Sequence, residues 1–420
     1  ERFEGTDSYL ELQRGMRAKG RRHYLAASCA ALLAWKGEEA ANAFACTAQN
    51  MRPAAFCTEG GSAVAGKRLF RNGFRVRRRQ QAESVRMSPD IEQKQLRRDL
   101  QELVARHRAT NGRALWNLGL TAGLWSTALY LIHATNWYWL SVPFMAMVIS
   151  RIFMVFHDAS HLSFFRRAAH NRWLAEVSQF FVNYNWRYWA SIHNSHHAHF
   201  GDSTVKDTSL TIWFSEEDLR KAPWHLRAAH RLVRDPILFY PLASLFVFFL
   251  NKPITHAPMR VALPLLLWAA LGVKTTLWYL VATWMAGMLG VVAFHLQHHC
   301  NPAYRVPTDQ DRSSLLAAMS GSTRIPLPFP LSLFSMGIEY HHIHHHDVRV
   351  PGYNLQECDA EGQRLGLWDA AGVDTIRGWR AFKSLFHTQF EGSTKVAQLG
   401  SPPPRFKSFW PYTVLNLQDA

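Results

Sequence analysis

Two long apolar segments, joined by only two residues, constrain the fold of this chain more than any other feature. Residues 115–134 contain no Lys, Arg, Asp or Glu, and residues 137–156 contain a single charged residue, Arg151. A helix of about 20 residues is long enough to cross the hydrocarbon core of a bilayer. Because the link between the two segments is so short, the helices must be antiparallel neighbours. The sequence therefore predicts a transmembrane helical hairpin.

Basic residues at both outer ends of this hairpin indicate its orientation. Three arginines between residues 106 and 113 precede the hairpin, and Arg166 and Arg167 follow it. Lys and Arg are enriched on the side of a membrane protein that stays inside the compartment. Both ends of the hairpin are therefore expected to face the cytosol or stroma. Arg151 lies near that end, and its side chain is expected to extend to the lipid headgroups.

A second apolar region follows in the second half of the chain. We expect residues 236–250 to lie at the membrane interface or to insert partly, and 261–273 and 276–294 to form a second hairpin. The alternative is a spanning helix over 236–256 followed by a re-entrant segment over 257–273. Both arrangements leave the flanking polar regions on one side. The predicted fold class is an all-α integral membrane protein with two transmembrane hairpins, about four spans, capped by a helical cytosolic or stromal domain.

The first 95 residues have the composition of targeting sequences. Residues 16–45 combine a basic start, a short apolar stretch and an Ala-x-Ala-like cleavage site, which is the layout of a signal peptide. Residues 46–87 are basic, Ala-rich and poor in acidic residues, as transit peptides are. Together they favour a plastid membrane, with the endoplasmic reticulum, mitochondrial targeting or a basic tail without a targeting role as alternatives. The predicted membrane domain is then 96–375, followed by a C-terminal tail over 376–420.

Many of the 22 histidines fall into four short motifs at the ends of apolar segments. HDASH at 157–161, HNSHH at 193–197 and HHIHHH at 341–346 place histidines three or four residues apart, on one face of a helix. A fourth motif, FHLQHH at 294–299, ends the last predicted span. Each motif begins where an apolar or aromatic-rich segment meets the basic side. We therefore expect all four to meet in one layer just outside the membrane.

So many histidines in one place indicate a metal site. Neutral imidazole binds Zn, Cu, Fe or Ni through a ring nitrogen, whereas protonated rings would repel one another near an apolar slab. Structural zinc takes four ligands, so eight or more histidines support two metal ions. Asp158 and Glu339 are expected to orient imidazoles, and His133 to have a structural role. The sequence leaves open the roles of His295, His299, His342 and His346.

The motifs resemble the histidine boxes of the membrane fatty acid desaturase family: His-x-x-x-His, His-x-x-His-His and a third His-x-x-His-His. The resemblance extends to HDASHLSFF at 157–165, DTSLTIWFSEEDLR at 207–220, FHLQHHCNPAYR at 294–305 and GIEYHHIHHHDVRVPGYNLQEC at 337–358. It is greatest for the omega-6, or delta-12-like, acyl-lipid branch. His346 stands where these relatives usually have an apolar residue.

The resemblance implies an oxygen-dependent enzyme that introduces a cis double bond into the acyl chain of a membrane lipid. It also implies a di-iron centre whose ligands would be His157, His161, His193, His196, His197, His298, His341, His344 and His345. Electrons would come from an external carrier, ferredoxin in a plastid or cytochrome b5 in the endoplasmic reticulum. The sequence contains no motif of a fused cytochrome b5 domain and no Gly-rich flavin or nicotinamide fingerprint.

Two other classes of function remain open from the sequence. A fatty acid or carotenoid hydroxylase or ketolase would use the same metal site to insert oxygen, although the resemblance over 337–358 argues against the carotenoid branch. A non-enzymatic, His-rich metal-binding membrane protein or transporter is the other class, but transporters usually place their ligands near the bilayer midplane. No nucleic-acid partner is expected. Gly287 and Gly290 could leave room for an acyl chain or pack helices closely.

Overall fold

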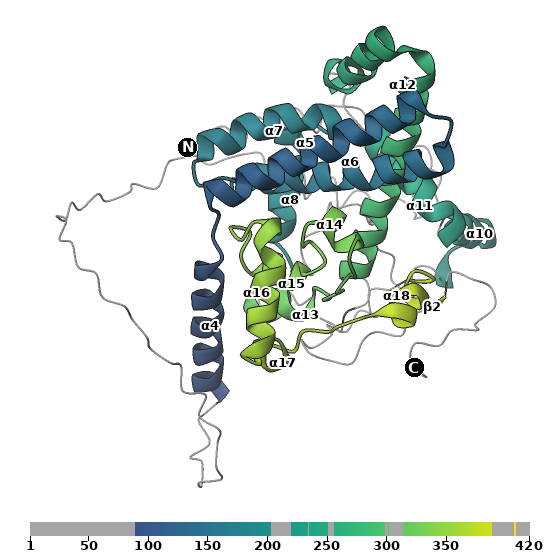
Figure 1. Ribbon diagram of the computed structural model, residues 1–420. Helices are drawn as coiled ribbons and strands as arrows, with labels where there is room; N and C mark the ends of the chain where they lie inside the picture. The colour runs from purple at the N-terminus through teal and green to yellow at the C-terminus, as the bar shows by residue number, and fades with distance from the viewer. Residues whose placement is uncertain are drawn as a thin grey trace, which may run out of the picture. The chain divides into compact units, whose positions relative to one another are not determined.

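The computed structural model is almost entirely helical over the residues that it describes. These are 89–202, 220–233, 235–250, 256–298, 301, 314–388 and 407–408. Within them, one antiparallel pair of two-residue strands, β1 (His387–Thr388) and β2 (Lys407–Ser408), accompanies the helices (Figure 1). The predicted all-α class is confirmed at this level. The signal-like and transit-like segments, 16–45 and 46–87, lie outside the described residues.

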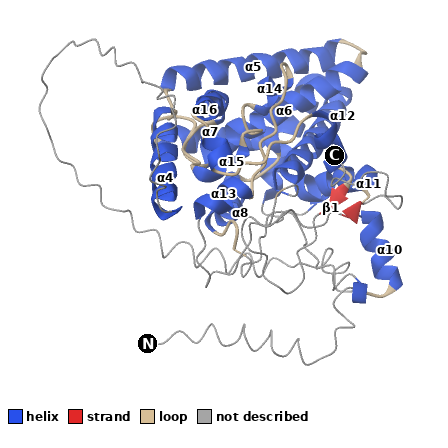
Figure 2. Ribbon diagram, turned by 90° about the horizontal axis from the view of Figure 1, so that it is seen from below, coloured by secondary structure: helices blue, strands red, loops and turns tan. Residues whose placement is uncertain are grey.

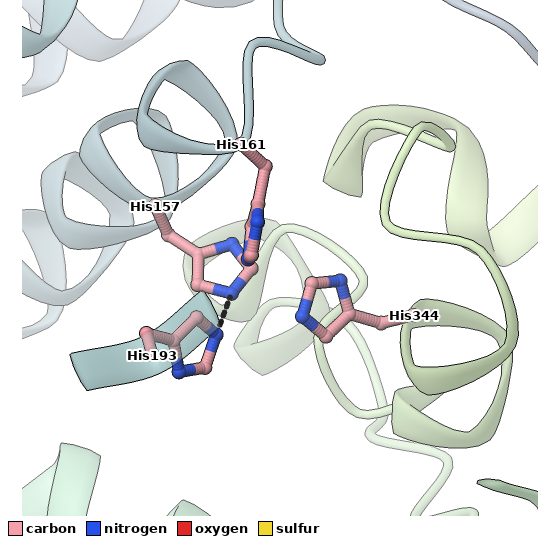
Figure 3. A group of neighbouring side chains, drawn as sticks. All are labelled: His157, His161, His193 and His344. Carbon is pink, nitrogen blue, oxygen red and sulfur yellow. Dashed lines mark hydrogen bonds between the residues drawn. The ribbon is translucent and has the colours of Figure 1, made fainter. Parts of the chain in front are cut away.

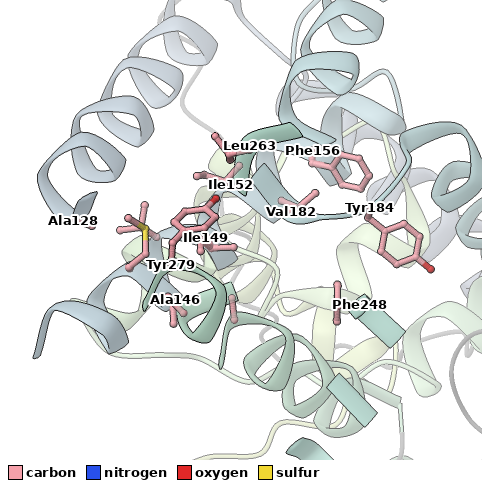
Figure 4. Packing of buried hydrophobic residues seen from close by; sticks show 14 of the residues in the cluster. Ala128, Ala146, Ile149, Ile152, Phe156, Val182, Tyr184, Phe248, Leu263 and Tyr279 are labelled. Atoms are coloured by element: carbon pink, nitrogen blue, oxygen red, sulfur yellow. The ribbon is translucent and has the colours of Figure 1, made fainter. Parts of the chain in front are cut away.

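The predicted first hairpin consists of α5 (Asn111–Ala134) and α6 (Tyr138–Ser160). The two helices pack against each other, and residues such as Ala128 and Ile149 belong to the largest apolar core of the described chain (Figure 4). By length and composition, α6 is one of two described helices that could cross a membrane. The link of residues 135–137 is as short as the sequence predicts.

The chain then returns to the end of α6 through two shorter helices. α7 (Ala168–Val182) packs along α6, and α8 (Trp186–Ala198) follows after a reversal at Asn183, whose φ of 56° is left-handed. The side chain of Asn185 caps α8 by accepting a hydrogen bond from the Tyr188 amide at 3.0 Å. As a result, the second histidine motif on α8 lies beside the first one at the end of α6.

The second apolar region forms α10 (Trp224–Val233), α11 (Pro236–Leu245), the π-helix η1 (Phe246–Leu250) and the long helix α12 (Ala257–His298). α12 is the other described helix that is long and apolar enough to cross a membrane. It contains one non-helical residue, Gly272, with φ of 83°. A positive φ of this kind favours glycine because it has no Cβ. The two halves of α12 correspond to the two segments predicted for the second hairpin.

The kink in α12 lies against the link between α5 and α6. Lys274 donates a hydrogen bond to Asn136 at 3.1 Å, and His133 Nδ1 lies 3.1 Å from Thr275 Oγ1. His133 therefore has the structural role that was predicted. From this point, the second half of α12 packs on α6 and ends at the histidines.

Gly287 and Gly290 on α12 have different environments. A Cβ added to Gly287 would overlap Ser244 Oγ of α11 and would lie 2.8 Å from Phe248 Cδ2. A Cβ added to Gly290 would meet no atom within 4 Å. Gly287 therefore allows α11 and η1 to pack closely on α12, and it leaves no space for an acyl chain at that position.

Arg151 of α6 is buried in the protein, so the prediction that it extends to lipid headgroups is wrong. Only 2 % of the residue is exposed. Its guanidinium donates hydrogen bonds to Thr121 Oγ1 at 2.9 Å and to Asn117 Oδ1 at 2.7 Å, both on α5. It also donates to the backbone carbonyl of Leu333. The physical reason for the difference is that these internal acceptors replace water around the charge.

The remaining helices form the layer that contains the third histidine motif (Figures 1 and 2). They are α13 (Ser314–Ser320), α14 (Leu331–Ser335), α15 (His341–His346), α16 (Gly352–Arg364), α17 (Leu367–Ala370) and α18 (Gly378–Ser384). α13 packs against α15, and α14 packs against α6. These contacts connect the third histidine motif to the helix that carries the first one.

α4 (Pro89–Arg106) at one end and residues 376–385 near the other end of the described chain both pack against other helices. α4 buries Leu100 and Leu103 in a core shared with α16 and α17. Near the other end, the hydroxyl of Tyr240 donates to the Leu385 carbonyl at 2.9 Å, and Ile376 is buried. Ile376, Ala381 and Leu385 of the predicted tail therefore share an apolar cluster with α12.

Candidate metal centre

Histidines from four separate helices meet in one cluster, in which each side chain is buried or half-buried. They come from the end of α6, from α8, from the last residue of α12 and from α15. The nine histidines predicted as ligands all make ring contacts in this cluster: His157, His161, His193, His196, His197, His298, His341, His344 and His345. The predicted convergence of the four motifs is therefore confirmed as geometry.

The first of two groups contains His157, His161, His193 and His344. One ring nitrogen of each lies within 4.8 Å of the corresponding atoms of the others. Figure 3 shows the four rings directed toward one another, with 3.1 Å between Nε2 of His157 and Nε2 of His193. Two motifs far apart in the sequence are thus joined to a third one from α15.

The second group contains His196, His298 and His345, whose ligand atoms again lie within 4.8 Å of one another. Nε2 of His196 is 3.3 Å from Nε2 of His345. His341 extends this group, since its Nε2 lies 2.9 Å from Nε2 of His298. The fourth motif therefore contributes His298, as the sequence predicts.

His197 lies between the two groups. Its Nε2 is 3.1 Å from Nε2 of His193 and 2.9 Å from Nε2 of His344, both in the first group. Its ring centroid is 4.3 Å from that of His345 in the second group. The two groups are therefore adjacent, and His197 contacts both of them.

Several rings of the cluster are oriented by partners outside it. His157 Nδ1 lies 3.0 Å from Asp158 Oδ1, and His298 Nδ1 lies 3.1 Å from the Gly321 carbonyl. These contacts direct Nε2 of both rings to the centre, because a neutral imidazole donates through one nitrogen and accepts through the other. Trp189, one helical turn before His193, stacks on it at 4.2 Å. The predicted orienting role of Asp158 is thus observed.

Glu339 differs from that prediction. It is buried, and no hydrogen bond joins its carboxylate to an imidazole among the described residues. Burial raises the pKa of Glu339 to about 7.

Three of the four histidines left open lie in the described residues, and none of them belongs to either group. His295 Nε2 is 3.1 Å from the Ser384 carbonyl. The His342 ring packs on Trp368 at 4.5 Å. His346 lies at the end of α15, where burial lowers its pKa. His299 lies outside the described residues.

The cluster keeps its rings neutral and fits a metal. Burial and neighbouring imidazoles hold the pKa values of His193, His197 and His344 well below 6.5. Buried His161 Nε2 has no hydrogen-bond partner. Neutral rings that direct lone pairs at one another gain most from a cation between them. An all-nitrogen donor set fits first-row transition metals such as iron and zinc, and its size fits two ions.

The metal-free protein is expected to lose stability as the pH falls below about 6.5. In this range an unfolded chain binds protons on these histidines and the folded chain does not, so acid favours unfolding. Each such histidine contributes about 1.4 kcal/mol per pH unit below that value. Thermal unfolding midpoints of metal-free protein between pH 8 and 5 would measure the effect. A midpoint that stays constant over this range would contradict it.

Comparison with known proteins identifies the family. A model of the family described as fatty acid desaturase matches residues 134–366, which include all nine histidines. The chain therefore belongs to the fatty acid desaturase family, and the predicted class of enzyme is confirmed at that level. The match covers α6, α8, α12 and α15, the helices that form the cluster.

Three relatives show the range of this family. A protein of Bacillus subtilis named fatty acid desaturase is 27 % identical over 251 residues, 56 % of this chain and 71 % of the relative. An sn-1 oleoyl-lipid 12-desaturase of Synechocystis sp. is 25 % identical over 268 residues, 59 % and 75 % of the two chains. A sphingolipid delta(4)-desaturase of Rattus norvegicus is 25 % identical over 242 residues, 54 % and 67 %.

Proposed function

We propose that this chain introduces a cis double bond into the acyl chain of a membrane lipid, with two iron ions and dioxygen. The observation that carries the proposal is the pair of adjacent imidazole groups at the ends of two long apolar helices. The acyl-lipid desaturase from Synechocystis sp. among the relatives supports a lipid substrate. The nine clustered histidines are the proposed iron ligands.

The side chains around the cluster have three tasks in this proposal. Neutral rings supply lone pairs to the metal, and Asp158 and the Gly321 carbonyl hold two of the rings in place. Bound iron would supply an oxidant strong enough to remove hydrogen from an unactivated methylene, which no side chain can do. Trp189 covers His193 and contacts Phe156, so the first group is shielded from water on that side.

The proposed substrate reaches the cluster from the bilayer. We propose four spans: α5, α6 and the two halves of α12, with the histidines just beyond their inner ends. The apolar helix α6 carries His157 of the first group near its end, so an acyl chain that lies along α6 would end near that group. With the histidines just outside the bilayer, only the apolar acyl chain of the lipid has to lie in the hydrocarbon region, and its polar headgroup stays at the surface.

We propose that an external carrier, ferredoxin or cytochrome b5, supplies the electrons. Arg166, Arg167 and Arg172 are exposed where α7 begins, beyond the end of α6. A cluster of this charge attracts an acidic protein. The targeting composition of the first 95 residues favours a plastid membrane and ferredoxin, and the endoplasmic reticulum with cytochrome b5 is the alternative.

Expression in a host that lacks polyunsaturated fatty acids tests the proposed reaction. Gas chromatography of fatty acid methyl esters, with a parallel measurement of sphingolipid bases, is expected to show a new double bond that requires oxygen. His196→Ala is expected to abolish the product while the protein still inserts. Hydroxylated products without a new double bond would instead favour a hydroxylase or ketolase. Bound zinc with no oxygen-dependent product would favour a metal-binding protein.

A further inference from the structure

The two ends of the segment that carries the third histidine motif lie against each other. Gly337, with φ of 88°, stands so close to Gly352 that an added Cβ would overlap the Gly352 carbonyl oxygen. A Cβ added to Gly352 would in turn lie 2.5 Å from the Met336 carbonyl oxygen. The 14 residues between the two glycines, which include α15, therefore form a loop whose base is a contact between two backbones.

α6 contacts this loop base through Asp158. The amide of Gly352 donates a hydrogen bond to Asp158 Oδ2 at 2.6 Å, while Oδ1 contacts His157. One carboxylate thus joins the first histidine motif to the downstream end of the third-motif loop.

α6 contacts the upstream side through Arg151. Arg151 and Asp158 are seven residues apart, which puts them on one face of α6 about 10 Å from each other. The Arg151 guanidinium donates to the Leu333 carbonyl of α14, four residues before Gly337. Phe334, the next residue of α14, packs against Phe144 of α6.

Arg151 has the chemistry of a fixed connector. Its guanidinium is always charged and is planar, with five N–H donors. Two of its acceptors, Asn117 and Thr121, lie on α5, and the third, the Leu333 carbonyl, lies on α14. α14 has only five residues, too few to be stable as an isolated helix. Of the three helices that Arg151 joins, α14 is therefore the one whose position depends most on these hydrogen bonds.

We propose that Arg151 is a positioning residue for the metal centre. It fixes α14 on α6 and, together with Asp158, sets the loop of residues 337–352 so that His344 faces His157 and His161. The proposal rests on the proposed function for its metal readout, but the position of the loop can be measured without metal.

Hydrogen exchange and metal content together test this role. Arg151→Met removes the donors and keeps the length of the side chain, Arg151→Lys keeps the charge, and Arg98→Met on α4 removes an exposed arginine as the matched control. In metal-free protein in lipid nanodiscs, Arg151→Met is expected to speed amide exchange over 331–352 by about tenfold or more, with less than about a twofold change in α8. Iron bound per chain is expected to fall by about half or more.

The remaining variants sharpen the result. Arg151→Lys is expected to be intermediate, since an ammonium cannot reach acceptors on both helices as the fork does, and Arg98→Met is expected to match wild type. Wild-type exchange over 331–352 in Arg151→Met would overturn the proposal, and so would an equal rise throughout the protein. If Arg151→Met does not fold, Arg151→Lys is judged by the same two criteria. If the wild-type protein binds no iron but Arg151→Met still speeds exchange over 331–352, the proposed function is rejected and the positioning role of Arg151 is kept.

Discussion

Replacement of His298 by alanine is expected to reduce desaturation by more than about 100-fold, because even partners that only orient a metal ligand are worth about 10–100-fold. His298 is the one histidine by which the described part of α12 reaches the cluster. Its loss would leave His196 and His345 of the second group, with His341 beside them. The product yield per amount of protein, measured as fatty acid methyl esters, would show the effect.

His295→Gln is the matched control for this change. His295 is three residues earlier on α12 and is buried to the same degree, but its Nε2 contacts the Ser384 carbonyl instead of the cluster. Glutamine keeps a donor that can reach this carbonyl, so wild-type yield is expected within about twofold. Equal losses in the two variants would mean that burial in α12, rather than metal binding, explains the effect of His298→Ala.

Gly337→Ala is expected to destabilise the protein by about 2–5 kcal/mol and to reduce the metal content. The positive φ costs alanine about 1–2 kcal/mol. Overlap of the new Cβ with the Gly352 carbonyl oxygen adds about 1–3 kcal/mol, since the contact is between two backbones and cannot be relieved by a rotamer change. The thermal unfolding midpoint and the iron content of the purified variant would measure both effects.

Gly366→Ala separates the two parts of this cost. Gly366 also has a positive φ, 71°, but a Cβ at this position would meet no atom within 4 Å. Only the cost of the backbone conformation, about 1–2 kcal/mol, is expected there, with unchanged metal content. If Gly337→Ala is no more harmful than Gly366→Ala, the closed base of the third-motif loop has no energetic importance.

Local patterns were sufficient to predict the first hairpin and the histidine cluster. A link of two or three residues permits only antiparallel neighbours, which is why α5 and α6 form as expected. The spacing of three and four residues placed His193, His196 and His197 on one side of α8. Trp189 has the same spacing from His193, so its stacking could also have been predicted.

Features that depend on distant segments could not be predicted in this way. Arg151 is buried because the Leu333 carbonyl, 182 residues later, accepts one of its hydrogen bonds. His295 contacts the Ser384 carbonyl, 89 residues later, and nothing in the spacing of the fourth motif indicates this partner. Gly337 and Gly352 carry no local sign that their backbones meet.

The metal content of the purified protein tests the central claim most directly. After anaerobic reconstitution with ferrous iron and removal of excess metal, elemental analysis is expected to give two iron ions per chain, as two adjacent groups of imidazole ligands require. His298→Ala is expected to give fewer. Saturation of the wild-type protein at one ion or none, or at zinc in preference to iron under equal supply, would contradict a di-iron desaturase.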